Sequence, residues 1–173
     1  EDEIVKNGYK IYTEMDANSQ ANMQQTYENS YLFPTSESDG STAQSASVAL
    51  DPSTGAVRGL VGRVGGTGDT TFRNFNYATQ GKRSPGSTIK PLVVYAPALA
   101  SGWSINKDLP NTPIDYNGYT PTNYGGIETD DVPMYQALAN SYNIPAVYLF
   151  NQIGIQKGIS YGQKFGLNFD NVP

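Results

Sequence analysis

Length, composition and charge restrict the classes of protein to which this chain can belong. Its 173 residues, 38% hydrophobic and 16% charged, suit one globular domain with a moderate core. Because the chain has no His and no Cys, a Ser-His-Asp triad, imidazole metal sites, disulfides and thiolate chemistry are all excluded. The net charge of −5 and the scattered cations argue against a nucleic-acid partner. No apolar run approaches the roughly 20 residues of a membrane-spanning helix.

The first part of the chain predicts a helix beside a β-hairpin. Residues 8–16 have strand character, and residues 17–31 predict a polar helix with Asp16 or Asn18 near its start. Further on, two β-rich runs flank "DPSTG", residues 51–55. The Asp, Pro and Gly of this stretch favour a turn, so we expect the two runs to pair as a hairpin.

The glycine-rich stretch "GRVGGTGDTT", residues 62–71, invites comparison with a phosphate-binding loop. No Gly-Lys-Ser/Thr follows it, and the glycine spacing of a dinucleotide site is absent. We therefore interpret this stretch as a connection between elements.

The stretch "RSPGSTIKP", residues 83–91, places Ser87 at the start of a helix. A proline is tolerated only within about one turn of a helix start, so Pro91 fixes that start close to Ser87. The residues that follow, "LVVYAPALA", are apolar on most faces, which predicts a buried helix. Ser87 is therefore expected at the tip of a core helix.

Ser87 and Lys90 together suggest acyl-transfer chemistry. Residues three apart on a helix share a face, so the Lys90 amine can approach the Ser87 hydroxyl. The helix N-terminus favours an alkoxide and the oxyanion of a tetrahedral intermediate. Lysine accepts a proton only when neutral, which requires its pKa to be lowered by burial or by its neighbours. The alternative is an ordinary solvent-facing helix start, where serine is a common cap.

A second Ser-x-x-Lys pattern, Ser104 and Lys107, shows that the bare pattern is weak. Asn106 even completes a Ser-x-Asn pattern there. The surrounding "WSINKDLP" has no preceding Pro-Gly turn and no apolar helix after it, and it opens a loop-like region over 104–131. The context therefore favours Ser87 over Ser104 as the nucleophile.

Three helices are predicted in the last part of the chain, over 132–140, 144–154 and 154–166. The tripeptide "SYN" falls at the junction of the first two. If the chain is extended there, Ser141 and Asn143 project to the same side, because side chains of an extended segment alternate.

Three stretches together resemble the transpeptidase domain of class A penicillin-binding proteins: "FNYATQGKRSPGSTIKP", "YTPTNYGG" and "ALANSYNIPAV". The signature of this superfamily is Ser-x-x-Lys, a Ser-x-Asn type motif and Lys-Thr-Gly. The first two motifs are present, and residues 9–20 and 49–62 are also similar to the family. Arg83 ahead of the Pro-Gly turn favours class A over class B, in which an acidic residue usually stands there.

The resemblance implies an α/β (α+β) fold of the penicilloyl-serine transferase or serine β-lactamase-like type, with an antiparallel sheet and flanking helices. In this interpretation residues 1–33 are an initial strand and helix, and residues 34–173 are the N-terminal part of the domain. No Lys-Thr-Gly or Lys-Ser-Gly occurs before Pro173. The fold is therefore expected to be incomplete here, and the strand with that motif to come from a continuation or a second chain.

The resemblance also implies roles for the two motifs. Ser87 would be the acylated nucleophile, and Lys90 the base that activates it. Ser141 would relay the proton toward the leaving amine. Asn143 would orient Lys90 and hydrogen-bond the peptide amide of the substrate.

Further residues are expected to contact the substrate because they stand beside these motifs or in the tyrosine-rich loop. They are Thr88, Asn123, Tyr124 and Tyr142, and Tyr119 is a further candidate to line the cleft. The alternative for the loop aromatics is a structural role at turns.

The implied activity is a serine D,D-transpeptidase that cross-links peptidoglycan stem peptides and is acylated by β-lactams. No metal or organic cofactor is implied. The expected location is the extracytoplasmic face of the bacterial membrane, with an anchor outside this chain. One alternative is a D,D-carboxypeptidase or β-lactamase-like hydrolase, in which water accepts the acyl group. The other is a non-catalytic cell-wall-binding module.

Overall fold

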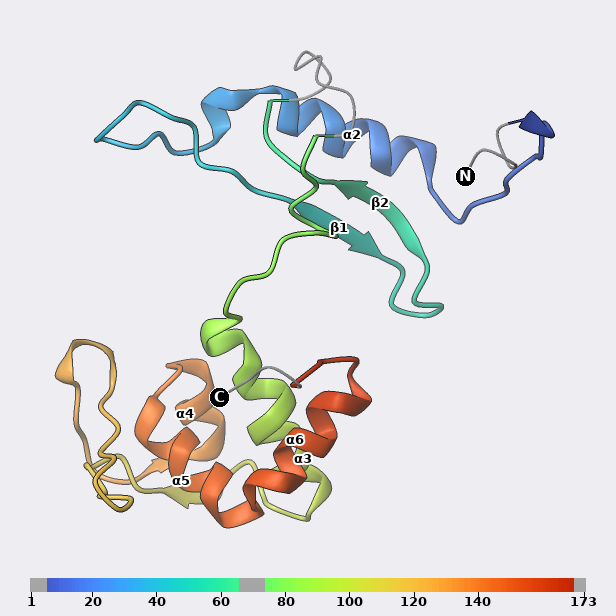
Figure 1. Cartoon of the computed structure of the whole chain (residues 1–173). Coiled ribbons are helices and arrows are strands. Elements are labelled where there is room, and N and C mark those ends of the chain that lie inside the picture. Colours follow the sequence, from blue (N-terminus) through green and yellow to red (C-terminus); the bar gives the residue numbers. More distant parts are fainter. Residues whose placement is uncertain (1–5, 66–73, 170–173) are drawn as a thin grey trace. The chain divides into compact units, whose positions relative to one another are not determined.

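The computed structural model describes residues 6–65 and 74–169. The chain divides into two compact units, residues 1–83 and 84–173 (Figure 1). Each unit has its own cluster of buried apolar side chains. The composition favoured one globular domain, and this stays a prediction, because two compact units can belong to one domain. The connection expected at 62–71 falls mostly outside the described residues.

The predicted N-terminal helix is confirmed as α2 (Ala17–Glu28). Of the two candidates for its start, Asp16 is the N-cap, and its Oδ1 accepts the Ser19 N–H at 2.7 Å. A short polar side chain favours this position because it satisfies one of the free N–H groups of the first turn. After α2 the chain continues in a short 3₁₀ turn, η1 (Ser30–Leu32).

The strand expected over 8–16 is wrong, because residues 9–16 form a loop. Among the described residues, the backbone contact between this loop and the hairpin is a single hydrogen bond, from Asp16 N–H to the Arg58 carbonyl at 2.9 Å. A strand requires a ladder of such bonds to a neighbouring strand. The apolar side chains of the segment, Tyr9, Ile11 and Tyr12, are exposed.

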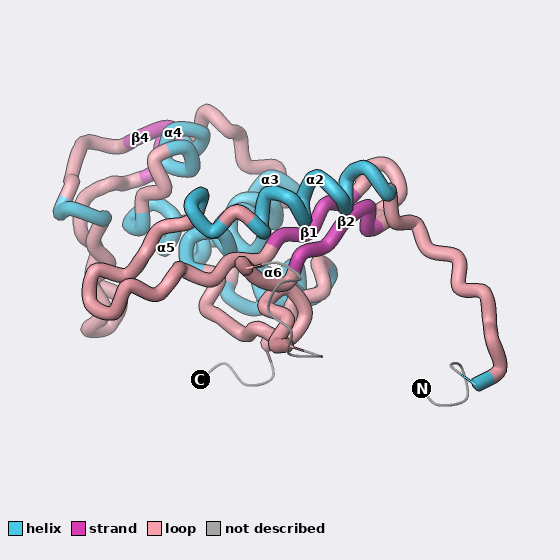
Figure 2. Tube along the Cα trace, turned by 90° about the horizontal axis from the view of Figure 1, so that it is seen from above, coloured by secondary structure: helices cyan, strands magenta, loops and turns pink. Residues whose placement is uncertain are grey.

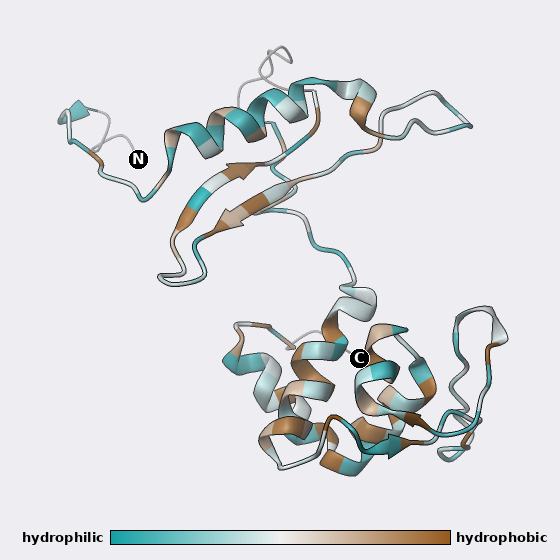
Figure 3. Cartoon of the chain, turned by 180° about the vertical axis from the view of Figure 1, so that it is seen from behind, coloured by the Kyte–Doolittle hydropathy of each residue, from teal (hydrophilic) through white to brown (hydrophobic). Residues whose placement is uncertain are grey.

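The predicted hairpin is confirmed. Strands β1 (Ser47–Leu50) and β2 (Val57–Val61) pair antiparallel, with one irregularity in the register. Asp51 begins the turn, and its Oδ1 accepts the Ser53 N–H at 2.9 Å. Gly55 has a φ of +74°, in the left-handed region that favours glycine. Figure 3 shows hydrophobic residues along both strands.

Helix α2 packs closely on strand β2. The Gln20 side-chain amide bonds to both backbone groups of Leu60, accepting its N–H at 2.8 Å and donating to its carbonyl at 3.0 Å. At Gly59 the helix comes so near that a Cβ would lie 2.7 Å from the Met23 sulfur. The buried core of this unit is small, and it consists of Tyr27, Val61 and Val64.

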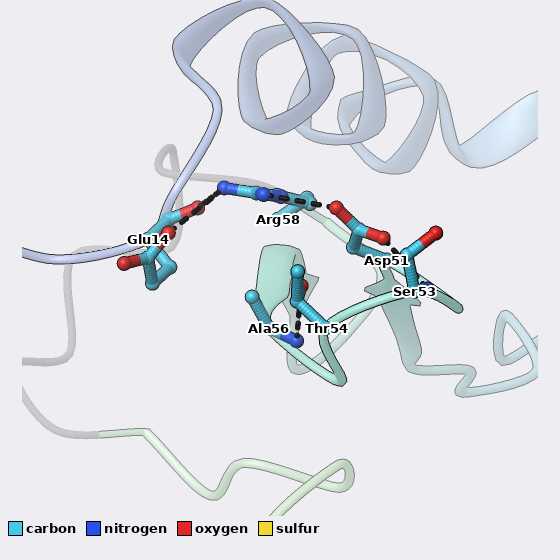
Figure 4. Close-up of polar contacts among 6 residues, drawn as sticks. All are labelled: Glu14, Asp51, Ser53, Thr54, Ala56 and Arg58. Carbon is cyan, nitrogen blue, oxygen red and sulfur yellow. Dashed lines mark hydrogen bonds and ion pairs between the residues drawn. The ribbon is translucent and has the colours of Figure 1, made fainter.

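Two ion pairs that share Arg58 connect the loop before α2, residues 9–16, to the hairpin (Figure 4). The Arg58 guanidinium bonds Glu14 at 3.1 Å and Asp51 at 2.9 Å. It also donates to the Glu14 carbonyl at 3.0 Å. The hydrogen bond from Arg58 is the main reason why the pKa of Asp51 is lowered, and the Ser53 N–H adds to this effect.

The helix that carries the Ser-x-x-Lys motif is the centre of the second unit. It runs as a 3₁₀ turn η3 (Gly86–Ile89), a π-helical segment η4 (Pro91–Tyr95) and a short α-helix α3 (Ala96–Ala100). The predicted start near Ser87 and the predicted burial are confirmed. The π-helical segment was not predicted. Because Pro97 has no N–H for the carbonyl one α-turn before it, the helix widens there.

The three helices predicted beyond the loop region are confirmed as α4 (Met134–Ala139), α5 (Asn143–Ile153) and α6 (Ile155–Lys164). Two short strands, β3 (Asp108–Leu109) and β4 (Val132–Pro133), pair antiparallel ahead of α4. Between these strands the chain is mainly loop, drawn pink in Figure 2, and includes the 3₁₀ turn η5 (Tyr124–Gly126).

Helix α6 lies directly against the motif-bearing helix. A Cβ at the buried Gly158 would be 2.5 Å from the Val93 carbonyl oxygen and would overlap the Phe150 ring. Only glycine allows this approach. The core of the second unit is larger than that of the first, and its buried members are Val93, Val94, Tyr95, Ala98, Leu109, Val132, Met134, Ala137, Ala146 and Leu149.

Candidate active site

The Lys90 amine is the point where both sequence motifs meet. Its Nζ donates to the Ser141 carbonyl at 2.6 Å and to the Asn143 Oδ1 at 2.7 Å. It also lies 3.2 Å from the Ser141 Oγ and 3.3 Å from the Tyr142 carbonyl. Residues about fifty positions apart in the chain therefore surround one nitrogen atom.

Ser87 lies one helical turn before Lys90, in η3, and it is exposed. The Lys90 backbone N–H donates to the Ser87 carbonyl. Within the described ranges no hydrogen bond, including one to the Lys90 Nζ, engages the Ser87 hydroxyl, so this exposed group is open to an incoming molecule. The Thr88 hydroxyl is already engaged, because it donates to the Pro85 carbonyl at 2.6 Å.

The junction at 141–143 is extended only at Tyr142, which corrects the fully extended geometry expected there. Ser141 is left-handed, with a φ of +54°, and Asn143 is the first residue of α5. A left-handed non-glycine residue costs about 1–2 kcal/mol. The side chains of Ser141 and Asn143 still converge, and both contact the Lys90 Nζ.

Two influences act on the protonation of Lys90. Burial lowers the pKa of its amine, because desolvation penalises the charged form. The surrounding carbonyl and amide oxygens accept its protons and so favour the ammonium. Among the described residues no carboxylate pairs with Lys90, so no opposite charge counteracts the effect of burial. The site therefore holds the amine in place, and the lowered pKa leaves more of it neutral, and so able to accept a proton, than in an exposed lysine at the same pH.

A pocket of about 500 Å³ lies beside this amine, within residues 84–173. Lys90 and Asn143 form part of its wall, together with Tyr119 and the apolar side chains of Val147 and Phe150. A mainly apolar pocket with a few convergent polar groups is the usual form of a small-molecule or peptide site.

The residues expected to contact substrate lie in different surroundings. Tyr119 lines the pocket, whereas Tyr124 is 96% exposed. Tyr142 is half-buried and offers its carbonyl to Lys90. Asn123 is only 4% exposed, and its Oδ1 accepts the backbone N–H of Asn143 at 2.7 Å. The Asn123 side chain, expected to contact the substrate, is instead buried and already engaged with α5.

Sequence reasoning missed two groups, one that holds Asn143 directly and one that holds its partner Asn123. The Thr122 carbonyl accepts from the Asn143 Nδ2 at 2.8 Å, and the buried Asn111 bonds the Asn123 side chain at 2.8 Å. Neither has a signal in the sequence, because a backbone carbonyl and a loop asparagine match no motif. Their positions depend on how the loop folds back on α5.

The second Ser-x-x-Lys pattern forms an exposed turn. The Ser104 hydroxyl accepts the Asn106 N–H at 3.2 Å, and the Ser104 carbonyl accepts the Lys107 N–H at 3.0 Å. These are local backbone contacts of a loop. The structure does not bring this serine and lysine into the site around Lys90.

In the part of the chain that the structure describes, none of the helices is both long and apolar enough to cross a bilayer. In the same ranges, no three His, Cys, Asp or Glu side chains gather in a way that could hold a metal ion.

Comparison with known proteins identifies the class. The family model "Penicillin binding protein transpeptidase domain" matches residues 45–171. The chain belongs to this family, and its relatives place it with the class A penicillin-binding proteins. Its fold is accordingly the mixed helix and sheet fold of these transpeptidases, present in part.

Particular relatives make this assignment specific. The chain is 60% identical to penicillin-binding protein 2a of Streptococcus pneumoniae strain R6 over 99% of its own length and 24% of that relative. It is 33% identical to penicillin-binding protein 1A of Clostridium botulinum strain Hall, over 96% of the chain and 21% of that relative. The chain thus spans about a quarter of the length of these curated relatives.

Solved structures share the fold. The penicillin-binding protein PonA1 of Mycobacterium tuberculosis superposes with a TM-score of 0.74 at 23% identity, covering 99% of this chain and 42% of that one. The same protein in complex with penicillin V gives a TM-score of 0.72 at 22% identity, over 99% and 44%.

Proposed function

We propose that this chain supplies the nucleophile, the base and the proton relay of a serine D,D-transpeptidase that cross-links peptidoglycan. The observation that carries the proposal is the Lys90 amine, whose pKa is lowered by burial, in hydrogen-bond contact with Ser141 and Asn143. Ser87 stands one turn away with an exposed side chain. Membership of the transpeptidase family supports the same reaction class.

In the first half of the reaction, the Ser87 Oγ attacks the carbonyl of the D-Ala-D-Ala peptide bond, and neutral Lys90 accepts the hydroxyl proton. The tetrahedral intermediate then breaks its C–N bond. Ser141, 3.2 Å from Lys90, passes the proton to the leaving amine, so that D-alanine departs and Ser87 carries an acyl ester.

In the second half, an amine of a neighbouring stem peptide attacks this ester. Its proton moves through Ser141 and Lys90 back to the Ser87 oxygen, and a new peptide bond forms as the ester breaks. The role of Asn143 is to hold the lysine and to offer its side-chain amide to the substrate backbone. A β-lactam would enter the same path up to the acyl ester, and the PonA1 complex with penicillin V is consistent with this.

The proposal places further parts of the site outside this chain. A Lys-Thr-Gly strand from the C-terminal part of the same domain, in a continuation or a second chain, would bind the substrate carboxylate. Thr88, Tyr119, Tyr124 and Tyr142 are proposed to contact the substrate around the pocket. The enzyme would act at the extracytoplasmic face of the bacterial membrane, anchored by another segment.

The nearest alternative is a D,D-carboxypeptidase or β-lactamase-like hydrolase, which would use the same residues but pass the acyl group to water. A cell-wall-binding module is a weaker alternative, since sugar binding by loop tyrosines has no need of a desolvated amine. Product analysis with an added acceptor amine distinguishes transfer from hydrolysis.

The test is covalent labelling of a full-length class A enzyme that carries this sequence. A fluorescent penicillin should label the tryptic peptide that contains Ser87, as located by mass spectrometry. Ser87→Ala should abolish the label, while Ser104→Ala, the matched change in the second Ser-x-x-Lys pattern, should leave it unchanged. Labelling of Ser104, or of neither serine, would refute the proposal.

A further inference from the structure

The side-chain amide of Asn123 has every hydrogen-bonding position occupied. Its Oδ1 accepts the backbone N–H of Asn143 at 2.7 Å and of Ile144 at 3.1 Å. Its Nδ2 donates to the Asn111 Oδ1 at 2.8 Å and to the Ile127 carbonyl at 2.7 Å. An asparagine amide can donate two hydrogen bonds and accept two, so no capacity remains for a ligand.

Asn123 therefore acts as the N-cap of α5, although it lies about twenty residues before that helix. The first N–H groups of a helix have no partner within the helix, and α5 has no side-chain cap from its own flanking residue. The N–H groups of its first two residues, Asn143 and Ile144, are both satisfied by the one oxygen of Asn123.

Behind Asn123 stands a second buried amide, Asn111, whose side chain is fully buried. Its Nδ2 donates to the Thr129 Oγ1 at 2.8 Å, and Thr129 in turn donates to the Asp130 carbonyl at 3.0 Å. The two amides thus connect the loop between β3 and β4 to the start of α5. Leaving either amide without its partner would expose a buried polar group to a desolvation cost.

Asn143 is consequently fixed by two consecutive residues. Asn123 holds its backbone N–H, and the Thr122 carbonyl accepts from its Nδ2 at 2.8 Å. This second bond directs the Asn143 Oδ1 at the Lys90 Nζ, 2.7 Å away. The orientation of the amine therefore depends on a loop that, among the described residues, makes no hydrogen bond to Lys90.

We propose that Asn123, supported by Asn111, is a positioning residue for the general base Lys90. It keeps the start of α5, and with it Asn143, in the arrangement that holds the Lys90 amine. This inference rests on the proposed transpeptidase function and adds a residue to it. It also replaces the expectation that Asn123 contacts the substrate.

The chemistry of the site explains why an asparagine stands at this position. An aspartate would accept the two helix N–H groups, but its second oxygen would face two acceptors, the Asn111 Oδ1 and the Ile127 carbonyl. A serine or threonine would cap the helix but would leave the Asn111 Oδ1 without its donor. The Asn123 side chain both accepts the two helix N–H groups and donates to the Asn111 Oδ1 and the Ile127 carbonyl.

The first experiment measures acylation by a fluorescent penicillin in the full-length class A enzyme that carries this sequence, with thermal melting to check folding. Asn123→Ala should lower the second-order acylation rate by about 10- to 100-fold per folded molecule, and Asn123→Asp by a similar factor. The matched control is Asn140→Ala, because among the described residues the Asn140 side chain donates to the Gln136 carbonyl of the preceding helix alone. The control should stay within about twofold of wild type.

Two readouts separate positioning from mere stabilisation. In an Asn143→Ala background, Asn123→Ala should lower the acylation rate by less than about threefold, because the two residues act through one contact. In the single variant, the acid limb of the pH–rate profile should move to lower pH, because an acceptor that favours the Lys90 ammonium is displaced. The inference is overturned if Asn123→Ala lowers the acylation rate by the same factor with and without Asn143→Ala, and if the pH–rate profile of the single variant is unchanged.

The result on the wild type distinguishes the two proposals. If wild type is labelled on Ser87 and Asn123→Ala acylates within twofold of it, the positioning role fails and the proposed function stands. If wild type is not labelled on Ser87, the proposed function fails, and this inference fails with it. Hydrogen exchange at the backbone N–H of Asn143 and Ile144 checks the cap independently, and exchange no faster in Asn123→Ala would also refute it.

Discussion

The two units of the chain use polar side chains in opposite ways. In residues 1–83, a small apolar core is accompanied by ion pairs at the surface, and the Glu14 side chain of this network is 73% exposed. In residues 84–173, a larger core surrounds neutral amides that are almost fully buried, together with the partly buried amine of Lys90.

This difference shows what a precise site requires of its surroundings. Exposed ion pairs are screened by water and typically contribute only about 0–1 kcal/mol. Buried hydrogen bonds cannot be exchanged for water, so each amide must stay with its partner. The buried amides of the second unit can therefore fix the position of a single nitrogen atom, whereas the ion pairs of the first unit only tie a loop to a hairpin.

The largest expected effect tests the base in the second unit. Lys90→Ala and Lys90→Arg should both abolish acylation of the full-length enzyme while circular dichroism stays unchanged. Arginine keeps the positive charge and the donors, but it cannot be deprotonated in proteins and so cannot accept the serine proton. The control is Lys107→Arg, in the second Ser-x-x-Lys pattern. An arginine variant at position 90 within about threefold of wild type, less than ~1 kcal/mol in barrier, would exclude this role.

The pH dependence of the wild-type acylation rate follows from the same residue. Lys90 accepts a proton only in its neutral form, so the rate should rise with pH as the amine loses its proton. Because burial lowers the pKa of Lys90, this rise should occur below the usual titration range of lysine. A rate profile whose acid limb lies at or above that range would contradict the effect of burial.

The next effect compares close packing in the two units. Gly158→Ala should destabilise the second unit by about 1–3 kcal/mol or more, because the new Cβ would meet a backbone carbonyl and a ring. Gly59→Ala is the matched change in the first unit, where the Cβ would meet the flexible end of Met23 at 2.7 Å. We expect the smaller loss there, measured by denaturant unfolding. Equal losses of stability would contradict the expectation that the α2–β2 interface accommodates a new Cβ more easily than the packing around Gly158.

The same substitution at two tyrosines should destabilise the fold at one position and not at the other. The Tyr27 hydroxyl bonds the Ser45 and Ser47 hydroxyls, so Tyr27→Phe should destabilise by about 1 kcal/mol. The Tyr95 hydroxyl is buried and has no hydrogen-bond partner among the described residues, and burial raises its pKa to about 12. Tyr95→Phe removes this unsatisfied group and should be neutral or stabilising. Thermal melts of both variants measure these changes in stability. A loss of stability in Tyr95→Phe equal to that in Tyr27→Phe would contradict the prediction.

The smallest effect concerns the ion pairs of the first unit. Arg58 is the main cause of the lowered pKa of Asp51, so this carboxylate stabilises the fold above its unfolded pKa. That contribution is lost as the pH falls through the folded pKa. In Arg58→Ala the pKa of Asp51 should rise toward its usual range, as followed by NMR titration, and added salt should weaken the effect in wild type. An unchanged pKa would show that the Ser53 N–H alone determines it.

The sequence alone determined the elements whose signals are local. A polar cap at Asp16 or Asn18, "DPSTG" as a turn and Pro91 as a marker of a helix start each act within a few residues, and the structure then selected Asp16. The same holds for the helices after the loop, whose apolar patterns and boundaries are continuous in the chain. The two motifs also indicated the family, because their residue types and spacing are specific when taken together.

The tertiary structure alone decided how these parts act on one another. The segment 9–16 has strand composition but finds no neighbouring strand in the described part of the chain. Ser141 reaches Lys90 from a left-handed turn, and Asn123, which sequence reasoning assigned to the substrate cleft, is buried as the cap of α5. A hydrogen bond between residues far apart in the chain leaves no pattern in either local sequence, because it depends on where the fold brings the two groups together.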